Sequence, residues 1–71
     1  MNLTVIIERE DDGYVSFCPE IDIASQGNSI AEARDNIREA LELFFECASH
    51  EEKKRRLHTE IFITQVEVWG G

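Results

Sequence analysis

The chain has 71 residues, a length at which a polypeptide forms one domain, so we expect a single domain over residues 1–71 and no multidomain enzyme. Its hydrophobic fraction of 42%, with one proline and four glycines, is typical of a folded domain. The 15 acidic residues outnumber the 7 basic ones and give a net charge of −8. This charge disfavours direct binding to nucleic-acid phosphates and favours a basic protein partner.

The cysteines and the N-terminal residues indicate the compartment. Cys18 and Cys47 allow at most one disulfide, and residues 1–4 lack the basic segment and apolar run of a secretory signal. No segment approaches the ~18 consecutive apolar residues of a membrane span. We therefore expect a reduced, cytoplasmic protein. Because so small a core is marginal, oligomerisation or a partner is expected to add stability.

Alternating apolar residues predict three strands in the first part of the chain. Leu3, Val5 and Ile7 alternate toward one face, and Asp12-Gly13 then supplies a hairpin turn with a residue that tolerates positive φ. The second arm ends at Pro19, which cannot donate to a ladder. The expected strands cover residues 3–9, 14–18 and 21–25.

A helix is expected to follow a sharp entry at Gly27-Asn28. Ser29 lies three residues before Glu32, the spacing of a capping box. A stripe of apolar residues at spacings of three and four then predicts the face that covers the sheet. Its members are Ile30, Ala33, Ile37, Leu41, Phe44 and Ala48.

The last third of the chain predicts a loop and a final strand. Residues 49–56 have no apolar side to bury, which predicts a frayed helix end and a loop. Residues 60–68 predict a strand, with one bulge near Thr64-Gln65 because the apolar positions change parity there. The order β-β-β-α-β defines an α+β domain with an antiparallel-rich sheet and one helix packed on a face.

The sequence offers little catalytic chemistry, and we expect no enzymatic activity, metal or cofactor. There is no glycine-rich phosphate loop. The four residues best suited to bind a metal lack ligand spacing; they are Cys18, Cys47, His50 and His58. Two alternatives stay open: a Cys47–His50 nucleophile pair, disfavoured by acidic neighbours, and Glu20 with Asp22 as a carboxylate pair for metal-assisted hydrolysis. A solvated strand face is the commoner role for such a pair.

Five carboxylates share one stripe of the expected helix, roughly opposite the apolar stripe. They are Glu32, Asp35, Glu39, Glu42 and Glu46. Neighbouring like charges on a helix each cost about 0.2–0.5 kcal/mol, and Arg34 and Arg38 lie only at the flank. The stripe is either a solvent-facing surface of an acidic protein or a docking surface for a basic partner.

Apolar residues on the helix flanks indicate an additional interface. Leu43 and Cys47 lie on one flank and Phe45 on the other, so one sheet contact does not cover all three. We expect self-association into a dimer or higher oligomer through Leu43, Phe62 and Trp69. The residues expected to contact a partner are Glu39, Glu42, Glu46, Phe45, Glu20 and Asp22.

Two long segments resemble the HicB family of type II antitoxins. They are residues 17–29 (Phe-Cys-Pro-Glu-Ile-Asp-Ile-Ala-Ser-Gln-Gly-Asn-Ser) and residues 31–46, which include Glu39-Ala40-Leu41-Glu42. The turn at residues 12–15 and the segment 60–68 also follow the family pattern, so the resemblance covers almost the whole chain. It implies a partial ribonuclease H-like β-β-β-α-β fold.

The resemblance also implies a function. HicB proteins bind HicA toxins, small basic ribonucleases with a double-stranded-RNA-binding-like fold and a catalytic histidine, and block their access to mRNA. We therefore expect an antitoxin that occludes a HicA-type toxin. The alternatives are an interaction or regulatory module without a toxin and, less favoured, a small metal-dependent hydrolase.

Two departures from the family pattern matter. Many HicB proteins continue into a ribbon-helix-helix or helix-turn-helix segment, whereas this chain ends at Trp69-Gly70-Gly71, so we expect no operator binding by this chain alone. Some members carry Pro-Gly-Cys before the helix, where this chain has Asp22-Ile23-Ala24. The second departure affects a loop rather than the fold.

Overall fold

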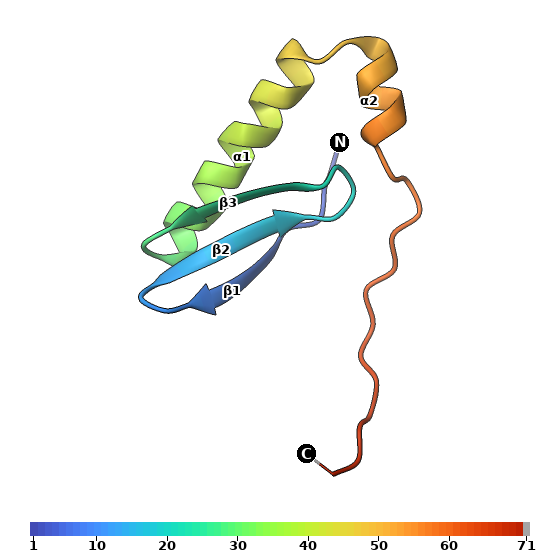
Figure 1. Ribbon diagram of the computed structural model, residues 1–71. Coiled ribbons are helices and arrows are strands. Elements are labelled where there is room, and N and C mark those ends of the chain that lie inside the picture. The colour runs from blue at the N-terminus through green and yellow to red at the C-terminus, as the bar shows by residue number, and fades with distance from the viewer. Residues whose placement is uncertain (71) are drawn as a thin grey trace.

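The computed structural model describes residues 1–70, which form a three-stranded antiparallel sheet with a long helix on one face (Figure 1). The elements are β1 (Ile6–Glu10), β2 (Gly13–Cys18), β3 (Ile23–Gly27), α1 (Ile30–Cys47) and α2 (His50–Arg56). The strand order is β1-β2-β3, so β1 and β3 are the two edges. The expected α+β class, with one helix packed on the sheet, is confirmed.

The β1–β2 hairpin closes through the two residues Asp11 and Asp12, because Glu10 pairs with Gly13. The positive φ of 52° falls on Asp11, so its expected place at Asp12-Gly13 was wrong. Aspartate tolerates this conformation through local hydrogen bonding to its own backbone. Gly13 is instead adapted to a close approach, since a Cβ there would lie 3.0 Å from the carbonyl oxygen of Gly27.

The core lies between α1 and the sheet. Cys18, Ile21, Ile37 and Leu41 form one buried cluster. Half-buried apolar side chains surround it, namely Leu3, Val5, Ile23, Phe44, Phe45 and Leu57. The buried Ser16 hydroxyl donates to the Ala33 carbonyl at 2.9 Å, which joins β2 to α1.

The expected apolar stripe of α1 is confirmed in its middle and wrong at its start. Ala33, Ile37 and Leu41 are buried. Ile30 is 57% exposed, because it is the first helical residue and helix side chains tilt toward the N-terminus, past the edge of the covered surface.

The start of α1 is fixed by the predicted cap and by the close approach of Gly27 to the first turn of the helix. The Ser29 hydroxyl accepts the Glu32 N–H at 3.0 Å, and the Glu32 carboxylate accepts the Asn28 N–H at 3.1 Å. Gly27 is required by close packing, since a Cβ would lie 2.5 Å from the Ala33 nitrogen. The chain therefore enters α1 in van der Waals contact with the end of β3.

The prediction of a loop over residues 49–56 was wrong, because this segment forms α2. Ser49 caps it by accepting the Glu52 N–H at 3.1 Å, which repeats the spacing of the α1 cap. Acidic residues occupy its first turn and basic residues its last, the order that the helix dipole favours. Caps and charge therefore define a short helix that has no buried residue.

The expected strand over residues 60–68, and with it the bulge, was wrong for the single chain. We call residues 58–70 the C-terminal segment; it contains no strand and runs away from the domain (Figure 1). The radius of gyration is 14.2 Å, against about 11 Å for a compact domain of this length. A strand requires a neighbouring ladder, and alternation alone does not show which chain provides it.

Candidate functional site

The carboxylates of α1 form an exposed acidic row on a helix held in place by the core. All five expected members are exposed, and Glu32 is engaged in the helix cap. We call the other four the acidic stripe: Asp35, Glu39, Glu42 and Glu46. Because α1 is anchored on the sheet, the stripe presents its charges at fixed spacing, which concentrates negative potential along one side of the helix.

The two flanks of α1 differ in exposure. Leu43 is 60% exposed and the Cys47 thiol is free and exposed, as expected for surplus apolar residues. Phe45 differs from the expectation because it is half-buried. Its ring packs edge-to-face on Phe44 with centroids 5.3 Å apart, and it contacts the core. Phe45 is thus partly used inside the molecule.

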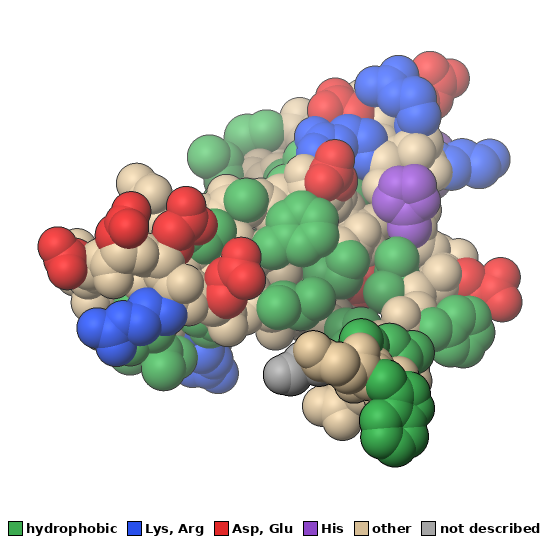
Figure 2. All heavy atoms as spheres, turned by 60° about the horizontal axis from the view of Figure 1, so that its bottom comes forward, with side chains coloured by type: hydrophobic (Ala, Val, Ile, Leu, Met, Phe, Trp, Pro, Cys, Tyr) green, Lys and Arg blue, Asp and Glu red, His purple; other side chains and the backbone are tan. Residues whose placement is uncertain are grey.

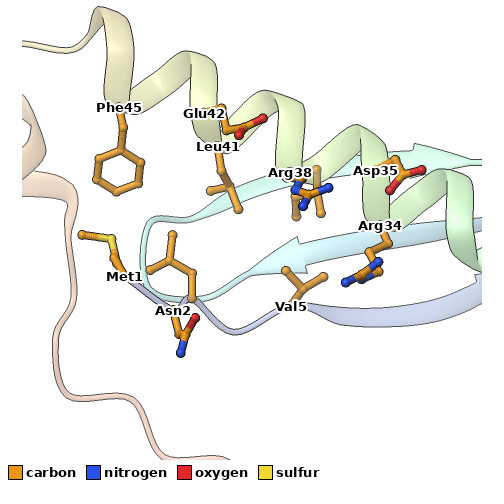
Figure 3. A pocket seen from close by; sticks show the side chains of 11 residues that line it. Met1, Asn2, Val5, Arg34, Asp35, Arg38, Leu41, Glu42 and Phe45 are labelled. Carbon is orange, nitrogen blue, oxygen red and sulfur yellow. The ribbon is translucent and has the colours of Figure 1, made fainter.

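A groove of about 440 Å³ separates the Phe45 flank of α1 from the N-terminal residues (Figure 3). We call it the β1 groove, since the N-terminal residues that line it lead directly into β1. From the N-terminal side it is lined by Met1, Asn2, Leu3 and Val5, and from α1 by Arg34, Asp35, Ile37, Arg38, Leu41, Glu42 and Phe45. Its floor is apolar and its helix rim carries two positive and two negative side chains.

The C-terminal segment carries a concentration of exposed apolar side chains. Figure 2 shows hydrophobic side chains gathered at the end of this projecting segment. Phe62, Ile63, Val66, Val68 and Trp69 have exposed fractions between 61% and 88%. Single exposed apolar residues are ordinary on a protein surface, whereas five within eight positions indicate an interaction surface.

The second face of the sheet is a smaller apolar surface. Ile6, Phe17 and Ala24 stand opposite one another across the three strands. Ile6 and Phe17 are exposed, so α1 covers only the other face. Ile6 lies between Val5 and Ile7, so the alternation predicted for the first strand turns it to the face opposite theirs, and the structure agrees.

Glu20 lies in the turn between β2 and β3 and ties the N-terminal residues to it. One carboxylate oxygen accepts the Thr4 N–H at 2.9 Å and the Thr4 hydroxyl at 2.7 Å, and the other accepts the Cys18 thiol at 3.6 Å. Burial opposes the charge, yet the hydrogen bonds from Thr4 outweigh it and the pKa of Glu20 is lowered. Glu20 is therefore engaged in the fold.

Asp22 and Cys18 occupy the same turn with different surroundings. Asp22 is exposed, has a positive φ of 58° and lies before β3, so Glu20 and Asp22 are turn residues and the expectation of a strand there was wrong. Burial, aided by the nearby Glu20 charge, raises the pKa of the Cys18 thiol. Within residues 1–70 no group of three or more His, Cys, Asp or Glu side chains is placed to hold a metal ion.

Arg56 has a structural role that its sequence position did not predict. Its guanidinium lies 5.0 Å from the centre of the Phe44 ring and donates to the carbonyl oxygens of Ile21 and Asp22 at 3.0 and 3.3 Å. Two residues further along the chain, the His58 N–H donates to the Glu20 carbonyl oxygen at 2.6 Å. The signal that could have indicated α2, and so the placement of Arg56, is the Ser49–Glu52 capping spacing.

Curated proteins with similar sequences bear the name UPF0150. Two are from Synechocystis sp., the UPF0150 proteins ssr1765 and ssl0738: the first is 49% identical over 47 residues (63% of this chain, 60% of that protein), the second 50% over 46 residues (62% and 64%). A UPF0150 protein from Helicobacter pylori is 42% identical over 45 residues, 62% of each chain. This chain therefore spans less than two thirds of the length of these relatives.

Comparison with family models and with solved structures identifies no further relative of this chain. No family model matches the chain, and no solved structure matches it. The names of the UPF0150 relatives state no activity or partner. Among residues 1–70, neither helix has the length and apolar character needed to cross a membrane.

Proposed function

We propose that this chain is an antitoxin that binds a small basic HicA-type ribonuclease and blocks its access to RNA. The observation that carries the proposal is the acidic stripe on α1, an exposed row of carboxylates on an acidic protein of net charge −8. The resemblance to HicB proteins over residues 17–29 and 31–46 supports it. The similarity to UPF0150 proteins adds relatives but no activity.

Occlusion requires binding rather than chemistry from this chain. A ribonuclease that acts on RNA needs a basic surface, because its affinity for phosphates comes from cations. A rigid acidic helix competes for that surface by complementary charge, and a net attraction also speeds encounter. The acidic stripe of this chain would therefore dock against the RNA-binding surface of the toxin, and this chain would perform no catalytic step.

The test first searches the genes beside that of this chain for a small basic protein, which the proposal requires, and then uses that protein in an RNA-cleavage assay. Cleavage should stop as this chain approaches one equivalent per toxin, and inhibition should weaken as salt is raised because exposed charges are screened. Cleavage that continues with toxin saturated by this chain would contradict occlusion. If no toxin binding occurs at low salt, the chain is an interaction module with another partner.

A further inference from the structure

The C-terminal segment has one face that suits a buried strand without any bulge. If it is extended, its even-numbered residues share a side, and Phe62, Val66 and Val68 lie there with the short Thr64 between them. The opposite side carries Gln65 and Glu67 beside its apolar residues. All three apolar residues of the even face are strongly exposed in the single chain.

The β1 groove is a matching acceptor for such a strand. β1 is an edge strand, so its outer backbone groups have no neighbouring strand within residues 1–70. An added strand would pair with this edge and turn one face toward Leu41 and Phe45, which α1 presents across the groove (Figure 3). Strand addition of this kind obtains affinity from the main chain and register from alternate side chains.

The charges around the groove fit an apolar strand better than a basic partner. Arg34 and Arg38 are balanced by Asp35 and Glu42 along the helix rim. The groove therefore lacks the surplus negative charge that the acidic stripe offers. The C-terminal segment brings only two charged residues, Glu60 and Glu67, so its approach is governed by its apolar face.

The path of the segment points to a second copy as its source. Arg56 at the end of α2 and His58 at the start of the segment bind the β2–β3 turn, and from there the segment leads away from the sheet and from α1 (Figure 1). Each copy has one segment and one groove. In a two-fold symmetric dimer each segment therefore occupies the groove of the other copy, and both grooves are filled. A domain whose buried core cluster has four residues gains stability from this added burial.

We propose that two copies of this chain exchange their C-terminal segments, each laying residues 60–68 along β1 of the other with Phe62, Val66 and Val68 facing the β1 groove. The added strand would pair with β1 and with the residues before it as far back as Leu3, where the alternation of apolar residues begins. The inference does not rest on the proposed function, since it uses the apolar floor of the groove; of the acidic stripe, only Asp35 and Glu42 stand on the groove rim.

The first experiment compares two substitutions at adjacent positions by sedimentation over a concentration series. Val66→Asp places a charge on the even face, while Gln65→Asp places the same charge on the opposite face as a matched control. The unaltered chain and Gln65→Asp should dimerise, and Val66→Asp should raise the dimer dissociation constant about tenfold or more, because it buries a carboxylate. Equal effects of the two substitutions, or a monomeric unaltered chain, would overturn the proposal.

The second experiment needs no substitution and separates exchange from folding back onto the same chain. Isotopically labelled and unlabelled chains are unfolded, mixed and refolded, and isotope-filtered NMR detects contacts between copies only. Contacts from Phe62, Val66 and Val68 to Leu3, Val5 and Phe45 should appear between labelled and unlabelled chains. Contacts that appear in the unfiltered spectrum and not in the filtered one lie within one chain and would reject strand exchange, as would their absence in a dimer.

Discussion

At the scale of single residues, the β2–β3 turn is where the fold is most dependent on polar contacts. Glu20 accepts hydrogen bonds from Thr4 and Cys18, and its backbone carbonyl accepts the His58 N–H. Arg56 adds two hydrogen bonds to carbonyls of the same turn. The N-terminal residues, the turn and the end of α2 are thus joined at one place.

The first prediction concerns Glu20 and pH. The Thr4 hydrogen bonds lower its pKa in the folded state, so the carboxylate contributes stability above its unfolded pKa of about 4.3, and this contribution is lost as pH falls through the lower folded pKa. Glu20→Gln should therefore cost about 1–2 kcal/mol at pH 7 and progressively less below about pH 4. Urea unfolding at both pH values measures it.

The matched control for Glu20 is Glu8→Gln, at an exposed position of β1. It removes the same charge from the same sheet and should leave the free energy of unfolding within about 0.5 kcal/mol. A Glu20→Gln penalty that is the same at pH 7 and pH 3.5 would mean that the carboxylate charge does not stabilise the turn.

The second prediction concerns the close packing of Gly27 against the first turn of α1. A Cβ there would meet the Ala33 nitrogen at 2.5 Å and the Glu32 carbonyl carbon at 2.8 Å, and these backbone atoms move only with α1. Gly27→Ala should destabilise the protein by about 1–3 kcal/mol or more. Gly13→Ala, with one backbone oxygen at 3.0 Å, should cost less. Thermal unfolding of both variants gives the order, and the reverse order would contradict the packing.

At the scale of elements, local signals predicted what local interactions stabilise. The hairpin followed from alternation and a turn of two residues, and α1 followed from its apolar stripe and the Ser29–Glu32 pair. These features depend on residues close in sequence, which explains their agreement with the structure. The exact positive-φ residue, Asp11, depended on register and was not predictable from composition.

Elements that depend on distant contacts were predicted poorly. α2 lacks an apolar stripe, and its last turn is positioned by Arg56 reaching Phe44 and the β2–β3 turn. The strand pattern of residues 60–68 specifies a conformation only when a ladder is present. For the candidate site, exposure of the acidic stripe was predictable, whereas the β1 groove arises from the offset of α1 over the sheet and was not.

The third prediction compares the two helix caps. Ser29→Ala removes the acceptor of the Glu32 N–H and should lower the free energy of unfolding by about 0.5–2 kcal/mol, because α1 carries the core. Ser49→Ala removes the equivalent acceptor in α2, which has no buried residue, and should cost less in global stability. Hydrogen exchange should then show faster opening in α2 alone. An unchanged denaturation midpoint in Ser29→Ala would contradict the role of this cap.

At the scale of the whole molecule, charge and apolar surface are separated. The acidic stripe lies along exposed α1, while the exposed apolar residues concentrate in the C-terminal segment. Long-range attraction acts before contact and is screened by salt, whereas apolar anchors act after water is excluded. The two surfaces are therefore suited to different stages of association.

The last prediction tests this separation with the proposed toxin. Replacing Glu39, Glu42 and Glu46 together with Gln removes three charges from the acidic stripe and relieves like-charge repulsion, so α1 should not be weakened. The association rate should fall and its salt dependence should flatten, with a smaller effect on dissociation, because exposed charges mainly steer encounter. Stopped-flow binding over a salt series measures both rates.

The control for the triple substitution keeps the same loss of net charge at another place. Glu8, Glu10 and Asp12 are exposed on β1 and its turn, so replacing them with Gln, Gln and Asn removes three charges away from α1. If docking uses the acidic stripe, this control should slow association less than the α1 variant, because local charge near the contact contributes more than net charge at distances beyond about 8–10 Å. Equal slowing by both variants would mean that net charge alone steers the encounter, and an unaffected rate in the α1 variant would leave the stripe as a solvent-facing surface and direct the search for the docking site to the sheet.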